Sequence, residues 1–153
     1  MHIDMSMLLI AISTAVVSVV GCVGMHLATL VTLSRTLDRW FSHAHWRAIG
    51  CLVLIAISAH LLEMGVFAVG IRVLELWHDG GSITHRAAFD AWYRSAVAYT
   101  SMGDETEPIA GVRLLLAVEA LTGLILIAWT ASFLFVVMER TWQDKLRRDD
   151  KRR

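Results

Sequence analysis

The sequence contains few prolines, few cysteines and few charged residues. It has one proline and two cysteines in 153 residues, which excludes proline-rich disordered proteins, collagen-like proteins and a disulfide framework. Charged residues make up 18% of the chain, against about 25% in an average soluble domain. Lys and Arg balance Asp and Glu at 14 each, so no excess of positive charge points to nucleic acid as a partner.

The signatures of the common enzyme classes are missing as well. The sequence has no glycine-rich phosphate loop, no HExxH zinc motif, no Cys-x-x-Cys pair and no nucleophile elbow. We therefore expect that the protein is not an enzyme.

What the sequence does have is three long apolar segments, 7–33, 48–71 and 114–138. The first contains no charged residue, and the other two contain one each, Glu63 and Glu119. A bilayer core of ~30 Å needs about 20 helical residues, so each segment is long enough to cross it. The remaining polar chain is too short to cover three such helices in water. The sequence therefore predicts an all-α membrane protein with three transmembrane helices.

The basic residues predict the orientation of these helices. The loop 34–47 carries three Arg against one Asp, and the tail 139–153 carries seven Lys and Arg against four acids. The segment 77–112 carries two Arg against five acids. Short loops rich in Lys and Arg stay in the cytoplasm. We expect a multi-pass protein of the bacterial inner membrane, with the N-terminus outside, the C-terminus inside and the lipid bilayer as its surroundings.

The outer segment contains a short amphipathic helix, predicted over 87–100. At 14 residues it would span ~21 Å, which is too short to cross the bilayer. It could lie on the membrane surface as a cap, or it could enter the membrane as a re-entrant pore helix. Arg94 would be buried in an inserted helix, where it could pair with Glu63, Glu119 or Asp90; a solvated Arg94 would favour the surface position.

Three segments, which follow one another along the chain, resemble segments of a known protein superfamily in the same order. The stretch His60-Leu61-Leu62-Glu63, the segment 89–104 and the segment 114–142 resemble the pore module of the potassium-channel superfamily. They are most similar to small bacterial potassium-channel-like membrane proteins that have an additional N-terminal helix. The resemblance implies a homotetramer with a re-entrant pore helix. It divides the chain into an N-terminal helix and cytoplasmic loop (1–47), a pore module (48–142) and a short charged tail (143–153).

The segment that aligns with the potassium filter is shortened. The family pattern is Thr-x-Gly-Tyr/Phe-Gly-Asp, whereas this chain has Thr100, Ser101, Met102, Gly103 and Asp104 and lacks the Tyr-Gly pair. This filter is similar to that of cyclic-nucleotide-gated cation channels, which are non-selective. Rings of backbone carbonyls provide potassium selectivity, so fewer rings imply weak selectivity between potassium and sodium. The alternative is a non-conducting relative that serves as a membrane interaction or structural protein.

Two acids follow the filter glycine. In a tetramer, Asp104 and Glu105 would form acidic rings at the outer mouth. Such rings concentrate cations and provide oxygen ligands, so calcium could bind there.

Ionisable residues inside the spans cost ~2.5–3.5 kcal/mol each by insertion scales, so they usually face protein or water. Glu63 and Glu119 are predicted at similar depth, and His60 shares a helix face with Glu63. They could support the pore helix from behind by bonding Tyr99, Thr100 or Ser101, or they could form a metal or proton site.

Two further residues of the spans, His26 and Gly123, are candidates for a haem ligand and a hinge. Haem ligation by His26 and His60 would require equal depth, whereas counting from the ends of the apolar runs separates them by ~7 Å. Gly123 in the third span is a candidate hinge, although such glycines are more often close-packing sites.

Overall fold

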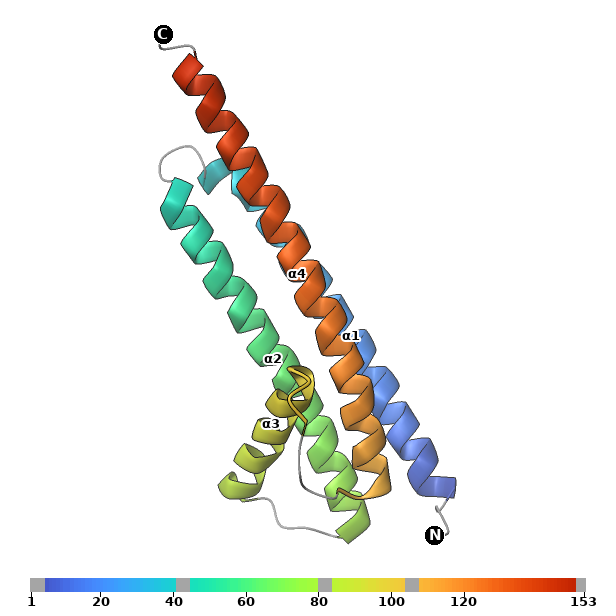
Figure 1. The fold of residues 1–153 in the computed structure, drawn as a ribbon. Helices are drawn as coiled ribbons and strands as arrows, with labels where there is room; N and C mark the ends of the chain where they lie inside the picture. The colour runs from blue at the N-terminus through green and yellow to red at the C-terminus, as the bar shows by residue number, and fades with distance from the viewer. Residues whose placement is uncertain (1–4, 41–44, 80–83, 104–107, 151–153) are drawn as a thin grey trace.

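The computed structural model describes residues 5–40, 45–79, 84–103 and 108–150. Within these ranges the chain is helical and contains no strand (Figure 1). The helices are α1 (Met5–Trp40), α2 (His45–Asp79), α3 (His85–Tyr99) and α4 (Ala110–Asp150). The segments Met5–Thr36, Arg47–His78 and Ala110–Gln143 are long and apolar enough to cross a membrane. The prediction of an all-α fold with three such helices is confirmed.

The long helices extend beyond the apolar runs from which they were predicted. α1 continues to Trp40 and α2 begins at His45, so most of the predicted loop 34–47 is helical. α4 continues through the charged tail to Asp150. Arg, Lys, Glu and Gln are good helix formers, and the single proline, Pro108, lies before α4. Nothing in the sequence therefore ends these helices where the apolar runs end.

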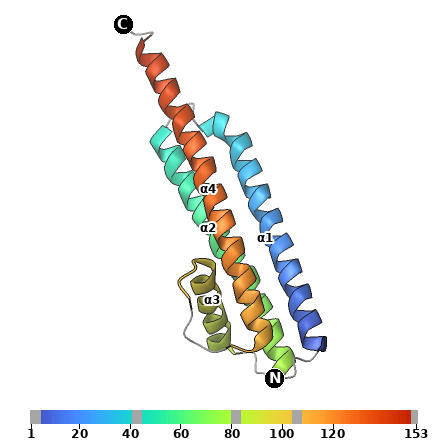
Figure 2. The same ribbon diagram turned by 45° about the vertical axis from the view of Figure 1, so that its right-hand side comes forward.

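The three long helices lie side by side, with α1 and α4 running in one direction and α2 in the other (Figures 1 and 2). The start of α1 and the start of α4 lie at one end of the bundle, and the C-terminus lies at the other. This alternation of ends agrees with the predicted topology. The side of the membrane that each end faces remains a prediction.

Small and polar residues line the sides on which the long helices face one another. On α1 the buried residues recur every three or four positions: Ala11, Ala15, Ser18, Cys22, His26, Leu30 and Leu33. Small side chains let helix backbones approach closely, which is how helices pack without a hydrophobic driving force from water. Large apolar side chains such as Val17 and Leu124 are exposed on the outside, where lipid would cover them.

The short helix α3 has defined caps at both ends. It begins two residues before the predicted start, where the Thr84 hydroxyl accepts a hydrogen bond from Ala87 N at 3.2 Å. At its other end Ser101 N donates to Ala98 O at 2.8 Å and Met102 N donates to Val97 O at 3.0 Å. This is a Schellman cap, in which Ser101 takes the left-handed conformation (φ 58°) that glycine usually provides.

The C-terminal end of α3 lies deep along α4. A Cβ atom added to Gly123 would overlap the Tyr99 carbonyl oxygen and lie 3.1 Å from its carbonyl carbon. Gly123 is 13 residues into α4 (110 to 123), so Tyr99 lies ~20 Å along α4 from its start. Figure 1 shows α3 running back alongside α2 and α4 rather than across the end of the bundle.

The close contact at Gly123 gives a testable prediction. Gly123→Ala should destabilise the protein by about 1–3 kcal/mol, because the new methyl group displaces the backbone at Tyr99. The matched control is Gly21→Ala in α1, where an added Cβ meets nothing within 4 Å and helix propensity favours alanine. Unfolding in detergent, followed by circular dichroism, measures both variants. Equal midpoints for the two would contradict the packing described here.

Candidate functional site

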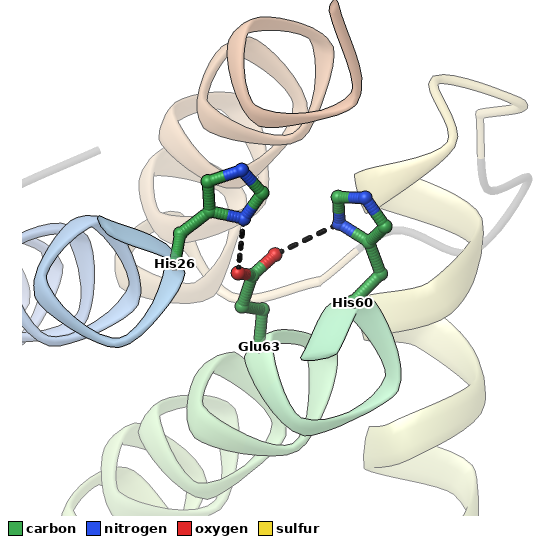
Figure 3. Close-up of side chains that lie close together, drawn as sticks. All are labelled: His26, His60 and Glu63. Atoms are coloured by element: carbon green, nitrogen blue, oxygen red, sulfur yellow. Dashed lines mark hydrogen bonds and ion pairs between the residues drawn. The ribbon is translucent and has the colours of Figure 1, made fainter. Parts of the chain in front are cut away.

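The centre of the site is the carboxylate of Glu63 on α2, which is fully buried. Its Oε1 lies 2.8 Å from Nδ1 of His26 on α1, and its Oε2 lies 3.0 Å from Nδ1 of His60, one helical turn earlier on α2. Both rings point their Nδ1 atoms at this carboxylate (Figure 3). The Tyr99 hydroxyl of α3 also bonds to Oε2 and lies 2.9 Å from Nδ1 of His60.

The opposite edges of the two rings share a partner on α4. The Thr130 hydroxyl oxygen lies 3.1 Å from Nε2 of His60 and 3.3 Å from Nε2 of His26. The two ring centroids are 5.4 Å apart. All four helices therefore contribute to one buried cluster, the Glu63 network, formed by His26, His60, Glu63, Tyr99 and Thr130.

The Tyr99 hydroxyl acts as a donor in this network. Burial, and next the hydrogen bond to the Glu63 carboxylate, raise the pKa of Tyr99 above its ordinary value. The phenol is therefore protonated at neutral pH and donates its proton to an oxygen or nitrogen acceptor beside it. Such hydrogen bonds offset the cost of burying the carboxylate.

The depth predicted for His26 relative to His60 is wrong. His26 is 14 residues before the end of α1 (26 to 40), and His60 is 15 residues after the start of α2 (45 to 60). The two helices are antiparallel neighbours, so the rings lie at the same depth. The estimate of ~7 Å was wrong because it counted from the ends of the apolar runs, whereas the helices extend beyond them by different amounts.

The second buried carboxylate, Glu119, holds α3 at a different point. Its Oε1 bonds to the Ser95 hydroxyl, which also lies 2.7 Å from the Met64 carbonyl oxygen. Ser95 is one turn before Tyr99, so the two carboxylates hold consecutive turns of α3. Among the described residues, the set that could hold a metal ion is His26, His60 and Glu63. Glu119, which the sequence grouped with His60 and Glu63 as an alternative metal or proton set, is not a member of this group.

Arg94 has a partner that the sequence did not indicate. Its guanidinium donates to Oε1 of Glu75 on α2 at 2.7 Å, and Arg72 bonds to the other carboxylate oxygen. Glu75 is four residues before the end of α2 at Asp79. Arg94 therefore shares the Glu75 carboxylate with Arg72 close to the end of the bundle and not at its middle.

The residues predicted as a filter follow directly after α3. Thr100, Ser101, Met102 and Gly103 are exposed, and the Met102 side chain is 79% exposed. Gly103 has a positive φ (80°), as Ser101 does, so left-handed residues alternate along this turn. An open pocket of about 460 Å³ lies between the turn and α4, lined in part by Ser101, Gly103, Ala117 and Ala120. The predicted ring residues Asp104 and Glu105 lie outside the described residues.

Comparisons with protein-family models, with curated proteins and with solved structures find no match. The resemblance to potassium-channel pore modules therefore stays a prediction from the sequence, and the function is argued below from geometry.

The hydrogen bonds of Tyr99 give a second testable prediction. Tyr99→Phe should destabilise the protein by about 1–3 kcal/mol, because Glu63 loses a donor inside a buried cluster. The matched control is Tyr93→Phe on the same helix, where the side chain is 58% exposed and the change should be near zero. Unfolding midpoints in detergent measure both variants. A Tyr99→Phe midpoint equal to that of the native protein would contradict the donor role.

Proposed function

We propose that this chain is the pore subunit of a passive cation channel, in which four copies surround residues 100–103. The observation that carries the proposal is an exposed, non-helical turn at mid-depth of the bundle. Gly123, which contacts the end of α3, lies nine residues into the apolar run 114–138, or ~14 Å. That depth is close to the middle of a bilayer core of ~30 Å.

Backbone that is not helical is tolerated at membrane depth only where protein buries it or where it lines water. Here the turn is exposed on a single chain, and the open pocket beside it leaves part of α4 uncovered. Further copies of the chain around a common axis would cover both. One copy contributes one such turn, and a four-fold arrangement closes the ring as in the family that the sequence resembles.

The left-handed Ser101 supports a functional role for this turn. A residue other than glycine in this conformation costs about 1–3 kcal/mol and persists where surrounding contacts hold it. The contacts that hold it here are the Schellman cap of α3 and the buried bonds of Tyr99. The Glu63 network and the Glu119–Ser95 bond thus fix the helix from behind, while the turn stays accessible.

Several features favour cations over anions. The C-terminal end of α3 carries the negative end of the helix dipole and points toward the turn. Residues 100–103 carry no charged side chain, so their carbonyl and hydroxyl oxygens are the groups available to an ion. The acids at 104 and 105 would add negative charge in the flanking sequence. The missing Tyr-Gly pair removes carbonyl rings, so we expect potassium and sodium to pass at similar rates.

Arg94 does not oppose an inserted α3. It forms a salt bridge with Glu75, which Arg72 shares, and this places the guanidinium near the end of α2, five residues from Tyr99. In the proposed orientation this salt bridge lies at the outer end of the bundle and the basic tail lies in the cytoplasm.

Cysteine modification at the turn tests the proposal. The exposed Cys51 is replaced by alanine, whereas the buried Cys22 is retained. Met102→Cys and Leu62→Cys are then compared in liposomes. Leu62 is 61% exposed and lies next to Glu63, at the depth of Tyr99, on a helix surface that lipid would cover. A positively charged methanethiosulfonate reagent should block potassium and sodium flux through Met102→Cys and leave Leu62→Cys unmodified, because only a thiol in water ionises and reacts.

Three results would count against this function. Absence of flux from the Cys51→Ala protein and from the native protein would favour the non-conducting membrane protein. Flux that persists after complete modification of Met102→Cys would show that the ion path does not pass this turn. Strong selectivity for potassium over sodium would refute the argument from the shortened filter.

A further inference from the structure

The two imidazoles of the Glu63 network face the same two partners, and this fixes how many protons the cluster needs. Both Nδ1 atoms face the Glu63 carboxylate, at 2.8 Å and 3.0 Å. Both Nε2 atoms face the Thr130 hydroxyl, at 3.3 Å and 3.1 Å. A neutral imidazole has one N–H and one lone pair, and a hydroxyl has a single proton to donate.

No arrangement with two neutral rings and an ionised carboxylate satisfies every contact. If both rings carry their proton on Nδ1, two Nε2 lone pairs face the one proton of Thr130. If both carry it on Nε2, the Thr130 oxygen accepts both bonds, but two Nδ1 lone pairs face Glu63. If the rings differ, one Nδ1 lone pair still faces a carboxylate oxygen. The Tyr99 proton can fill only one of its two contacts, with Glu63 or with Nδ1 of His60.

Each arrangement of two neutral rings is therefore short of one proton, on the Nε2 side if both rings carry Nδ1–H and on the Nδ1 side otherwise. Such a deficit in a buried site is costly unless a cation fills it. The cation can be a metal ion held by the lone pairs or one additional proton. The two cases differ in the protonation of the Nε2 atoms, which face Thr130.

We propose that the Glu63 network is a site for a divalent transition-metal ion of the zinc class, bound by Nδ1 of His26, Nδ1 of His60 and the Glu63 carboxylate. One ring nitrogen of each histidine and one Glu63 carboxylate oxygen all lie within 4.8 Å of one another. Zinc takes nitrogen and oxygen ligands at about 2.0–2.2 Å, which places neighbouring tetrahedral ligands ~3.4 Å apart. The observed separations of 2.8 Å and 3.0 Å need to widen by only a few tenths of an ångström.

Thr130 has the position of an outer partner for both ligands. With the metal on Nδ1, each ring carries its proton on Nε2 and donates it to the Thr130 oxygen, which has two lone pairs. A metal-bound imidazole usually donates its other N–H to such an oxygen, which fixes the tautomer and the ring orientation. Metal binding thus gives every ring nitrogen a partner while both contacts with Thr130 stay as they are.

Tyr99 completes the site. Its hydroxyl bonds to Glu63 and lies 2.9 Å from Nδ1 of His60, within reach of an ion at the centre. If it binds as phenolate, its proton leaves to solvent, and two negative oxygens balance the divalent ion. A neutral site is the form that an apolar bundle tolerates best. The ion would then link α1 and α2 to the last residue of α3, directly before the turn. This inference rests on the cluster alone and holds whether or not the protein conducts ions.

Cobalt and zinc binding test the inference. The full-length protein in detergent is treated with a chelator, dialysed and titrated with Co²⁺, whose visible absorption reports four-coordinate ligation. We expect one Co²⁺ per chain, displaced by one Zn²⁺, and a higher unfolding midpoint with the metal bound. His26→Asn and Glu63→Gln should lose the absorption. His85→Asn, which removes an exposed histidine of α3, should leave it unchanged.

Thr130→Val keeps every ligand and the volume of the side chain, so it tests the site even if the ligand variants fail to fold. It should weaken Co²⁺ binding about 10–100-fold, as loss of an outer partner usually does. Binding equal in Thr130→Val and the native protein would overturn the proposal. So would the absence of a four-coordinate spectrum in the native protein, in which case an additional proton fills the deficit.

Discussion

A carboxylate held inside an apolar bundle needs polar partners on every side, and Glu63 obtains them from three helices. His26 of α1, His60 of α2 and Tyr99 of α3 converge on its two oxygens, and Thr130 of α4 holds the far edges of both rings. Breaking any one of these contacts would leave a buried polar group unpaired, at a cost of about 1–3 kcal/mol. The position of each helix along the bundle is therefore tied to the others at this depth. The end of α3 and the turn that follows it depend directly on this arrangement.

Much of the architecture could be predicted from the sequence. Three apolar runs longer than 20 residues have no stable alternative to membrane-length helices, and the short helix predicted over 87–100 corresponds to α3 (His85–Tyr99). The proposal that intramembrane carboxylates bond to α3 came from their depth, and the structure has Glu63 bonded to Tyr99 and Glu119 bonded to Ser95. Hydrophobicity and depth predict these features because an error of one or two residues along a helix shifts the depth by only ~3 Å.

The pairing of side chains could not be predicted in the same way. Glu75 and Arg94 lie 19 residues apart on different helices, and no spacing rule links them. The partnership of His26 with Glu63 was missed because a few residues of error at each helix end shift the depth by several ångströms. A signal for His26 did exist: it follows Cys22 by four residues, on the face of small residues that packs inward. For Thr130, the 11-residue spacing from Glu119 (119 to 130) would have placed both on one face of α4.

The central claim is that the exposed turn after α3 lies inside the membrane and is enclosed by further copies of the chain. Its most direct test is the mass of the intact assembly in lipid nanodiscs, measured by native mass spectrometry. One chain has a mass of 17.1 kDa, so the account predicts a dominant species of about 68 kDa, four times that mass. A monomer, or a dimer or trimer as the dominant species, would leave the turn without the enclosure that membrane depth requires and would contradict the account.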